Sequence, residues 1–417
     1  MSRYRVILLL FIITLAGALY SGRALWWSFA GALFALLIVA VLWAWLGVNW
    51  LRIGRRTLTR TAQVGQMLNE EFVLHNLSSI PKLWVEVRDF SNLPGHYASR
   101  VIGWTGGNQW RGWKVSTYCT QRGRYSLGPL RVRSGDPLGI YQMDRRIDKV
   151  SSILVYPATW DFAEFPLPAG YLPGGESLRR RTHFVTTNAA GVRDYTNGDV
   201  INRIHWPLSV KRQRLTVKEF ELDPMSEIWV MLDLERNAQS RIGFPNADGA
   251  AAMISGGTAI SLPPRTEEYA ISMAASVARH FLRQNRPIGF LTYSHHREVI
   301  SSDRGERQIN KIMELLAVLQ ADGAVPFARV LRAEAAVLPR GTTVIAISSS
   351  PDVDWALAVQ QMVRSGQRVV AIVIDGESFG DPLPSAPVIG TLVEAGAVVR
   401  VVRCGESLAE AIGKPID

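Results

Sequence analysis

The sequence predicts a multidomain membrane protein with a transmembrane α-hairpin, a β-sandwich-like middle domain and a doubly wound α/β C-terminal domain. Three observations lead to this fold class. Two long uncharged apolar runs lie near the N-terminus, short alternating stretches follow, and near-continuous apolar runs then alternate with helical patterns. A chain of 417 residues is long enough for two or three domains. We predict the hairpin at 1–56, the β-rich domain at 57–160, a connector at 161–225 and the α/β domain at 226–417.

The N-terminal part contains two candidate membrane-spanning helices, at about 6–22 and 24–51. The first run, Val6–Tyr20, reaches the lower limit of a spanning helix when the next two residues are included, and the second, Ala24–Leu51, exceeds the roughly 20 residues that cross a bilayer. Five tryptophans lie toward the ends of the second run, as interfacial anchors do: Trp26, Trp27, Trp43, Trp45 and Trp50.

Arginines predict the orientation of this hairpin. Six of them flank the two runs on their outer sides: Arg3, Arg5, Arg52, Arg55, Arg56 and Arg60. Only Arg23 lies between the runs, so the positive-inside rule places both termini in the cytoplasm of a multi-pass inner-membrane protein. An alternative makes the first run a cleaved signal peptide. The second run would then still return the chain to the cytoplasm.

The overall charge permits several partners without requiring one. A formal net charge of +10 is compatible with anionic lipid or with nucleic acid. In the most basic stretch, 191–221, four acidic residues interleave with the basic ones, whereas a groove that follows phosphates should carry one sign of charge. The sequence therefore predicts the lipid bilayer and other proteins as partners, and no nucleic acid.

The middle domain shows the pattern of a small antiparallel sandwich. The stretches "LWVEVRDF", "WKVSTYC", "RYSLGPLRVRS" and "SILVYP" alternate in polarity and are separated by Gly, Pro, Asn and Ser. Trp104, Trp110 and Trp113 stand among glycines. They form either the tip of a partner-binding loop or a packed cover over the end of the sandwich.

The C-terminal half has the pattern of a parallel sheet covered by helices. The runs "IWVMLDL", "IGFLTY", "TVIAIS", "VVAIVI" and "AVVRVV" suit strands that are buried on both faces. Helical stripes lie between them at Glu267–Gln284 and Gly305–Leu319. Ligands of such sheets bind outside the carboxyl ends of the strands, which points to Asp233 and Asp352.

A metal site is the chemical alternative at this edge of the sheet. Asp233, Glu235 and Asn237 present oxygen atoms at alternate positions, and Asp352 could complete a set of ligands for Mg²⁺. The alternative is a purely structural role, in which Asp233 caps the next helix and Glu235 faces solvent. The sequence contains no Walker loop, Rossmann fingerprint, HExxH helix or GxSxG elbow. We therefore predict that the protein is not an enzyme, with a metal-dependent enzyme or ligand-binding protein as the rival.

The stretch "GVRDYTNGDVINRIHWPLSVKRQRLTVKEFE" combines a tight turn with a short helical or extended element and a strand. A structural role in the connector and a partner-docking surface both fit it. The stretch resembles the signature of the domain of unknown function 58 family at Arg193, Tyr195, Gly198, Asp199, Arg203, Ile204, Trp206, Lys218, Glu219, Phe220 and Glu221. An upstream motif of the family is matched by Arg122, Gly123, Gly128, Pro129, Asp136, Pro137 and Gly139.

This resemblance implies a von Willebrand factor A-like C-terminal domain. Related genes often accompany MoxR-type AAA+ ATPases and transglutaminase-like membrane proteins, which implies a membrane-tethered adaptor for the assembly or maturation of other proteins. A metal site of that fold would have the pattern Asp-x-Ser-x-Ser, where this sequence has Asp233, Glu235 and Asn237. The family-motif candidates for docking a partner are Arg193, Tyr195, Gly198, Asp199, Arg203, Trp206, Lys218 and Glu219.

Overall fold

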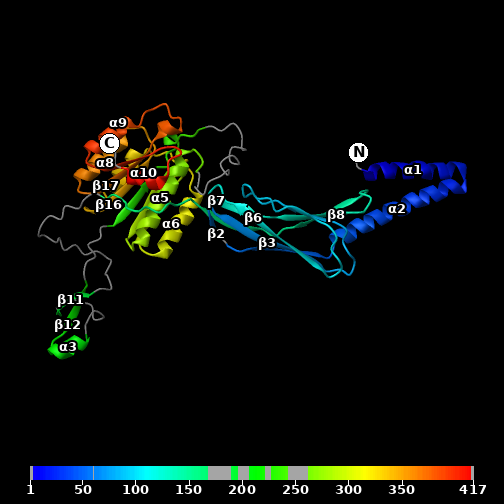
Figure 1. The fold of residues 1–417 in the computed structure, drawn as a ribbon, viewed down its shortest axis with the longest axis horizontal. Coiled ribbons are helices and arrows are strands. Elements are labelled where there is room, and N and C mark those ends of the chain that lie inside the picture. The colour runs from blue at the N-terminus through cyan, green and yellow to red at the C-terminus, as the bar shows by residue number, and fades with distance from the viewer. Residues whose placement is uncertain are drawn as a thin grey trace. The chain divides into compact units, whose positions relative to one another are not determined.

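The computed structural model describes residues 3–59, 61–167, 189–195, 206–220, 227–242 and 262–414. The chain divides into two compact units, the first formed mainly by Met1–Ala158 and the second mainly by the residues from Thr159 onward. The apolar helices and three sheets of mostly antiparallel strands belong to the first unit, and the six-stranded α/β sheet belongs to the second (Figure 1).

Two apolar helices open the first unit, as predicted. These are α1 (Arg3–Ser21) and α2 (Ala24–Val48). Their most apolar windows have mean hydropathies of 1.9 and 2.5, and only 6% and 22% of these windows are buried. Apolar surface of this extent on a helix pair is unfavourable in water. By length, composition and exposure the two helices are therefore suited to a lipid environment.

Helix α2 ends three residues before the predicted limit of 51. The backbone N–H and the side-chain amide of Asn49 both donate to the carbonyl oxygen of Trp45, at 3.1 and 2.8 Å. Trp50 then adopts a left-handed conformation, with φ of 57°. This turn redirects the chain into strand β1, which begins at Leu51, so the first strand starts inside the segment predicted as membrane anchor.

The β-rich part of the first unit contains three sheets. One has the order β1 (Leu51–Thr57), β3 (Met67–Asn76), β6 (Trp110–Tyr118). A second has the order β5 (Arg100–Ile102), β4 (Val85–Asp89), β8 (Leu130–Gly135), β9 (Gln142–Ile147). A third, smaller sheet has the order β2 (Thr61–Gln63), β10 (Ser151–Tyr156), β7 (Gly123–Leu127). The pairs are antiparallel except for β2 with β10.

Alternate residues of the first two sheets form one apolar core, as the period of two in a strand requires. Leu74 and Val87 from opposite sheets belong to this core. The rings of Phe72 and Trp113 stack within it at 5.1 Å. Trp113 is thus a core residue, whereas Trp104 and Trp110 are 57% and 68% exposed. The structure separates three tryptophans that the sequence alone left together.

A buried polar network also lies in the sandwich, and no sequence pattern predicts it. The Arg55 guanidinium donates to both carboxylate oxygens of Glu70 at 2.9 Å and to Asp89 at 3.4 Å. His96 Nε2 lies 2.8 Å from the second oxygen of Asp89, and its Nδ1 lies 2.7 Å from Thr117 Oγ1. Four of these side chains are almost inaccessible to water: Glu70, Asp89, His96 and Thr117. The side chain of Arg55 is slightly more exposed.

The second unit contains a six-stranded sheet in the order β15-β14-β13-β16-β17-β18. Its strands are β13 (Ile228–Leu232), β14 (Ile288–Tyr293), β15 (Arg297–Asp303), β16 (Thr343–Ser348), β17 (Arg368–Ile374) and β18 (Val398–Val402). All neighbours pair in parallel except β15, which is antiparallel to β14 at one edge. The predicted parallel arrangement of the five buried runs is confirmed, and β15 is an antiparallel edge strand that the sequence pattern does not predict.

Helices cover both faces of this sheet. One face packs on α7 (Phe327–Ala335), α8 (Asp354–Arg364) and α9 (Ala386–Glu394), with Trp355 in the middle of the shared core. The alternate strand residues point the other way, toward α5 (Thr266–Arg283), which contacts β13, β14, β16 and β17. Helix α6 (Glu306–Val318) follows β15 along the chain, and α10 (Leu408–Gly413) follows β18. Helices α5 and α6 confirm the two predicted stripes, and the body is a mixed α/β assembly of several sheets.

The predicted connector is described in part. Strand β11 (Ala189–Asp194) pairs in antiparallel fashion with β12 (Thr216–Phe220), and the short helix α3 (Trp206–Arg212) precedes β12. Together these three elements form what we call the motif module. The predicted turn "TNGD" at 196–199 lies outside the described residues.

Candidate functional site

The first candidate site lies where the strand order of the α/β sheet reverses. Strands β13 and β16 are neighbours, and the chain continues from β13 to one side of the sheet and from β16 to the other. In open sheets of this kind the crevice outside the carboxyl ends at such a point is the usual ligand site. Asp233 directly follows β13, and its backbone N–H donates to Ile347 of β16 at 2.9 Å. We call the place where the strand order reverses the switch point. Asp233, which the sequence predicts as a site residue, lies there.

The Asp233 carboxylate is buried and accepts two hydrogen bonds. The side chain is only 2% exposed. Oδ1 accepts from the backbone N–H of Glu235 at 2.9 Å, and Oδ2 accepts from the Ser348 hydroxyl at 2.6 Å. Burial, helped by the nearby charge of Glu235, raises the pKa of Asp233 to about 7 against the opposing effect of these hydrogen bonds. Asp233 can thus change its protonation state near neutral pH.

Hydroxyl and amide groups surround this carboxylate. Ser348 Oγ also accepts from the backbone N–H of Ser350 at 3.0 Å, and the Ser349 hydroxyl donates to the carbonyl oxygen of Ala238 at 2.6 Å. Gln239 joins the cluster through Ser349, whose hydroxyl lies 3.3 Å from the Gln239 amide oxygen, and the same oxygen accepts from the Thr266 hydroxyl at 2.9 Å. In the turn "SSSPD" the sequence pattern pointed to the aspartate alone. Ser348 ends the buried strand β16 and two more serines follow it, and this run of hydroxyl groups at a strand end is the signal for the cluster.

The other predicted metal ligands are placed differently. Glu235 is half-buried, whereas Asn237 is exposed in the short helix η2 (Arg236–Ala238). Asp352 is exposed, and its Oδ1 accepts from the backbone N–H of Asp354 at 3.0 Å, at the start of α8. Across the described ranges, no group of three or more His, Cys, Asp or Glu is arranged to hold a metal ion. The structure thus brings Asp233 together with Glu235 and Ser348, whereas Asp352 accepts a hydrogen bond from the first residue of α8.

The second candidate site is the motif module. The register pairs Arg193 with Val217 and Val192 with Lys218, and the backbone N–H of Tyr195 donates to Leu215 at 2.9 Å. The candidates Gly198, Asp199 and Arg203 lie outside the described residues, and Glu219 is described as part of the β12 backbone. The predicted strand "LTVKEFE" is therefore present in its middle part.

A buried serine organises the module from inside. The Ser209 hydroxyl, in α3, accepts from the backbone N–H of Thr216 at 2.9 Å and lies 3.1 Å from its hydroxyl. These two bonds fix α3 against the start of β12. Arg214 pairs with Asp194 across the module at 3.0 Å, although both side chains are largely exposed, so this ion pair contributes little stability.

Three large apolar side chains of the module are exposed. Trp206 is 58% exposed, Val210 is 76% exposed and Leu215 is 45% exposed. Trp206 and Val210 are four residues apart on α3, so they lie on one face of the helix. We call these three residues the apolar face of the motif module.

The fold and these sites define a class: a protein with two N-terminal apolar helices, antiparallel sheets and an α/β domain with a polar cluster at its switch point. The family described as "Protein of unknown function DUF58" matches residues 191–386. The match begins in β11 and includes both the motif module and the Asp233 cluster. The upstream motif at 122–139 lies before the matched residues.

One curated relative is the "Uncharacterized protein YeaD" of Bacillus subtilis (strain 168), which is 23% identical over 214 residues, or 51% of this chain and 47% of that protein. The chain thus spans about half the length of the curated relative it matches. Two solved structures cover 45% of this chain and 95% of theirs at 12% identity: an aerotolerance-related membrane protein from Bacteroides fragilis, with a TM-score of 0.31, and the conserved hypothetical protein BatB from Bacteroides thetaiotaomicron, with a TM-score of 0.30.

Proposed function

We propose that this protein is a membrane-anchored adaptor that binds other proteins through its motif module. In this proposal it is a multi-pass protein of a bacterial inner membrane with both termini in the cytoplasm. It works with a MoxR-type AAA+ ATPase in the assembly or maturation of other proteins. Its C-terminal domain is von Willebrand factor A-like.

The apolar face of the motif module carries this proposal. Exposed tryptophan is strongly enriched among the residues that dominate binding energy in protein interfaces. Trp206 and Val210 expose a continuous apolar stripe, and the basic Lys211 and Arg212 follow in the last turn of the same helix. An apolar centre with charged residues beside it is the usual anatomy of a protein-binding surface.

Two further features support the fold and the orientation in this proposal. Numbered within the domain, the strand order is 3-2-1-4-5-6, which is the order of a doubly wound sheet, with one antiparallel edge strand. The arginines that flank the helices, with only Arg23 between the apolar runs, favour cytoplasmic termini. A cytoplasmic domain has access to an ATPase that uses cytoplasmic ATP.

A crosslinking experiment in intact cells tests the proposal. A photoreactive amino acid is placed at Trp206 or Val210 of the full chain, with Val337 as a matched control because it is equally exposed in the α/β domain. We expect both module positions to capture one AAA+ ATPase and the control to capture none. Crosslinks only to proteins outside the cytoplasm would contradict the orientation, and crosslinks that are equal at all three positions would contradict the docking surface.

The proposed docking surface also predicts the effect of a substitution on binding affinity. We expect Trp206→Ala to weaken binding of the purified full chain to the captured partner by about 30-fold, which corresponds to the roughly 2 kcal/mol of a hot-spot tryptophan. Val337→Ala should leave the affinity unchanged. An affinity of the Trp206→Ala variant within error of wild type would remove Trp206 from the interface.

A second candidate function is metal-dependent ligand binding at Asp233, and the buried carboxylate at the switch point favours it. Asp233, Glu235 and the Ser348 hydroxyl offer oxygen donors, and Mg²⁺ often uses one or two carboxylates with water completing its octahedron. We expect calorimetry with Mg²⁺ and with Mn²⁺ to give heat for wild type and none for Asp233→Asn at pH 8, where the proton competes least. Equal heats for both proteins would exclude a metal at Asp233.

A further inference from the structure

We propose that the end of the β-sandwich at which α2 enters is a lipid-binding surface that inserts tryptophan side chains into an anionic headgroup layer. The inference rests on the membrane anchorage proposed above and adds a second, peripheral contact with the same leaflet. We call this end of the sandwich the lipid-facing end. Its loops are residues 49–50, 77–84, 103–109 and 136–141.

Strand register places these four loops at one end. Leu51 pairs with Asn76, and His75 pairs with Trp110, so the start of β1, the end of β3 and the start of β6 coincide. In the other sheet Val85 pairs with Ile102. Glu86 pairs with Arg133, which places the β8–β9 turn at the same end.

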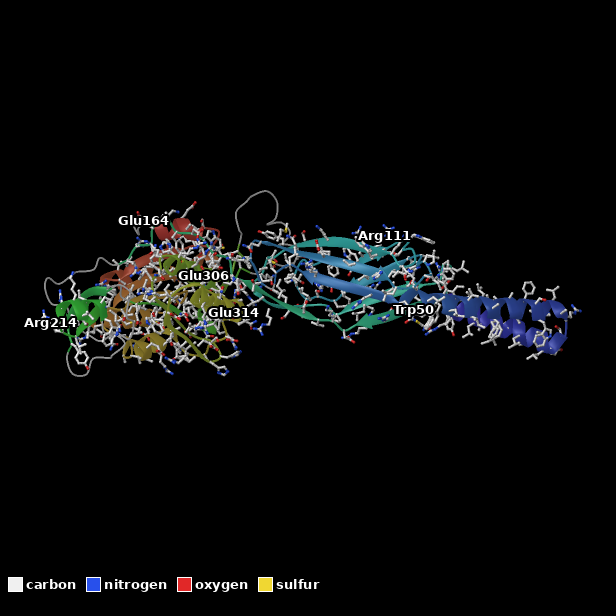
Figure 2. The ribbon with its side chains drawn as sticks, turned by 90° about the horizontal axis from the view of Figure 1, so that it is seen from below. Trp50, Arg111, Glu164, Arg214, Glu306 and Glu314 are labelled. Carbon is white, nitrogen blue, oxygen red and sulfur yellow. The ribbon has the colours of Figure 1, made fainter. Side chains whose placement is uncertain are left out.

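Contacts join the two sheets at this end. Lys82 bridges to Thr105 in the loop that precedes β6, and its ammonium group donates to the carbonyl oxygen of Leu46 in α2. The same ammonium group lies 5.9 Å from the ring centroid of Trp50. Loops from both sheets and the end of α2 therefore form one surface, where Trp50 and Arg111 can be located in Figure 2.

The surface is apolar and rich in tryptophan. Six large apolar side chains of this end are exposed: Trp50, Leu77, Ile80, Trp104, Trp110 and Leu138. Tryptophan favours the boundary between hydrocarbon and water because its ring is apolar and its N–H is polar. Trp104 and Trp110 are exposed and do not pack inside the sandwich, so a headgroup layer would remove their rings from water.

The charges of this surface have one sign. Within residues 49–52, 75–84, 103–111 and 135–142 the charged side chains are Arg52, Lys82, Arg111 and Asp136. Asp136 is buried, and its carboxylate accepts from the backbone N–H groups of Leu138 and Tyr141 at 2.9 and 2.6 Å. The exposed charges are therefore arginines, and each basic residue near an anionic leaflet favours binding.

The length of α2 sets the depth of this surface. A helix of 25 residues is about 37 Å long, and the roughly 20 residues needed for the hydrocarbon core end near Trp43. The remaining turn of α2 contacts β8, where Gly47 lies so close that a Cβ would meet Ser134 Oγ at 2.6 Å. The sandwich therefore begins within the headgroup layer.

The β8–β9 turn reaches even deeper along the helices. Ile140 packs on Leu37 and Ala40 of α2, and the rings of Tyr4 and Tyr141 meet edge to face at 5.6 Å. Since Leu37 and Ala40 lie inside the span that ends near Trp43, this turn reaches past the headgroup layer, beside the first turn of α1. Trp104 lies in the loop before β6, and Trp110 is the first residue of β6, at the same end of the sandwich.

The test uses the full chain in nanodiscs that contain phosphatidylglycerol. A fluorescent amino acid is placed at Trp104 or Trp110, at Phe34 as a position inside the span, and at Leu58 as an equally exposed position at the opposite end of β1. Brominated lipids then report which labels touch lipid. We expect quenching at 34, 104 and 110 and none at 58. We also expect Arg52→Gln with Arg111→Gln to lower the ratio of docked to undocked protein about 30-fold, as loss of two basic contacts predicts, whereas Arg124→Gln with Lys149→Gln should not.

The outcomes separate the two proposals. Quenching at 34 but not at 104 or 110 would overturn the lipid-facing end and leave the anchor intact. No quenching at 34 would overturn the anchorage itself, and the present inference with it. Labels at 104 and 110 that are shielded in native membranes but not in nanodiscs of pure lipid would assign the surface to a protein partner instead.

Discussion

Replacing Arg55 with methionine is expected to destabilise the β-sandwich by about 3–5 kcal/mol, the cost of breaking a buried ion pair from one side. Arg55 donates to both oxygens of Glu70 and to one oxygen of Asp89, and both carboxylates are shielded from water. Without the guanidinium, two negative charges remain buried near each other. Denaturant unfolding of the full chain in detergent measures the change in stability. Hydrogen exchange of the amides in β1 and β3 measures it locally.

The neighbouring Arg56 supplies the control for this prediction. Arg56 is exposed, so Arg56→Met should change the stability by no more than about 0.5 kcal/mol. Adding Glu70→Gln to Arg55→Met should recover part of the loss, because one buried charge is then removed. If Arg55→Met and Arg56→Met had equal effects, Arg55 would not be holding the sandwich together.

The network also predicts how the sandwich responds to acid. Burial raises the pKa of Asp89, but hydrogen bonds from His96 and Ser91 and the charge of Arg55 outweigh it, so the pKa lies below its ordinary value. A lowered pKa in the folded state contributes stability at pH values above the unfolded pKa of about 4. This contribution is lost as the pH falls through the lowered folded value.

The second large effect is expected at Asp233, with the opposite dependence on pH. The pKa of Asp233 is raised to about 7 in the folded protein, so the unfolded chain loses its proton first as the pH rises. The contribution of Asp233 to stability is therefore greatest below pH 4 and falls by about 4 kcal/mol between about pH 4 and pH 7. Asp233→Asn resembles the protonated acid and should not show this loss.

Hydrogen exchange measured at several pH values follows this effect in the full chain. The opening free energies of amides in β13 and β16 should fall with pH in wild type and stay level in Asp233→Asn. Asp352→Asn serves as the control, because Asp352 is exposed and its carboxylate bonds only the backbone N–H of Asp354 among the described residues; its profile should keep the slope of wild type. Parallel profiles for wild type and Asp233→Asn would show that Asp233 titrates alike in the folded and unfolded chains.

The elements that were predicted well are those whose pattern is local. Helices α5 and α6 follow their apolar stripes almost to the residue, because a period of 3.6 is set by the backbone of the helix itself. The five parallel strands were also predicted from a local pattern, because strands buried on both faces form near-continuous apolar runs. The position of Asp233 outside a strand end also followed from the order of elements.

Local sequence patterns are enough to predict the two apolar helices, the alternation of the middle strands and the placement of Asp233 after a buried strand, because these depend on neighbours in the chain. Three other facts follow from the folded structure alone: Trp113 is core while Trp110 is exposed, Ser348 meets Asp233, and Arg55 lies against Glu70. These facts depend on strand register and on contacts between residues far apart in the chain. Period-two alternation assigns a side chain to a face, but the partner strand decides what that side chain touches.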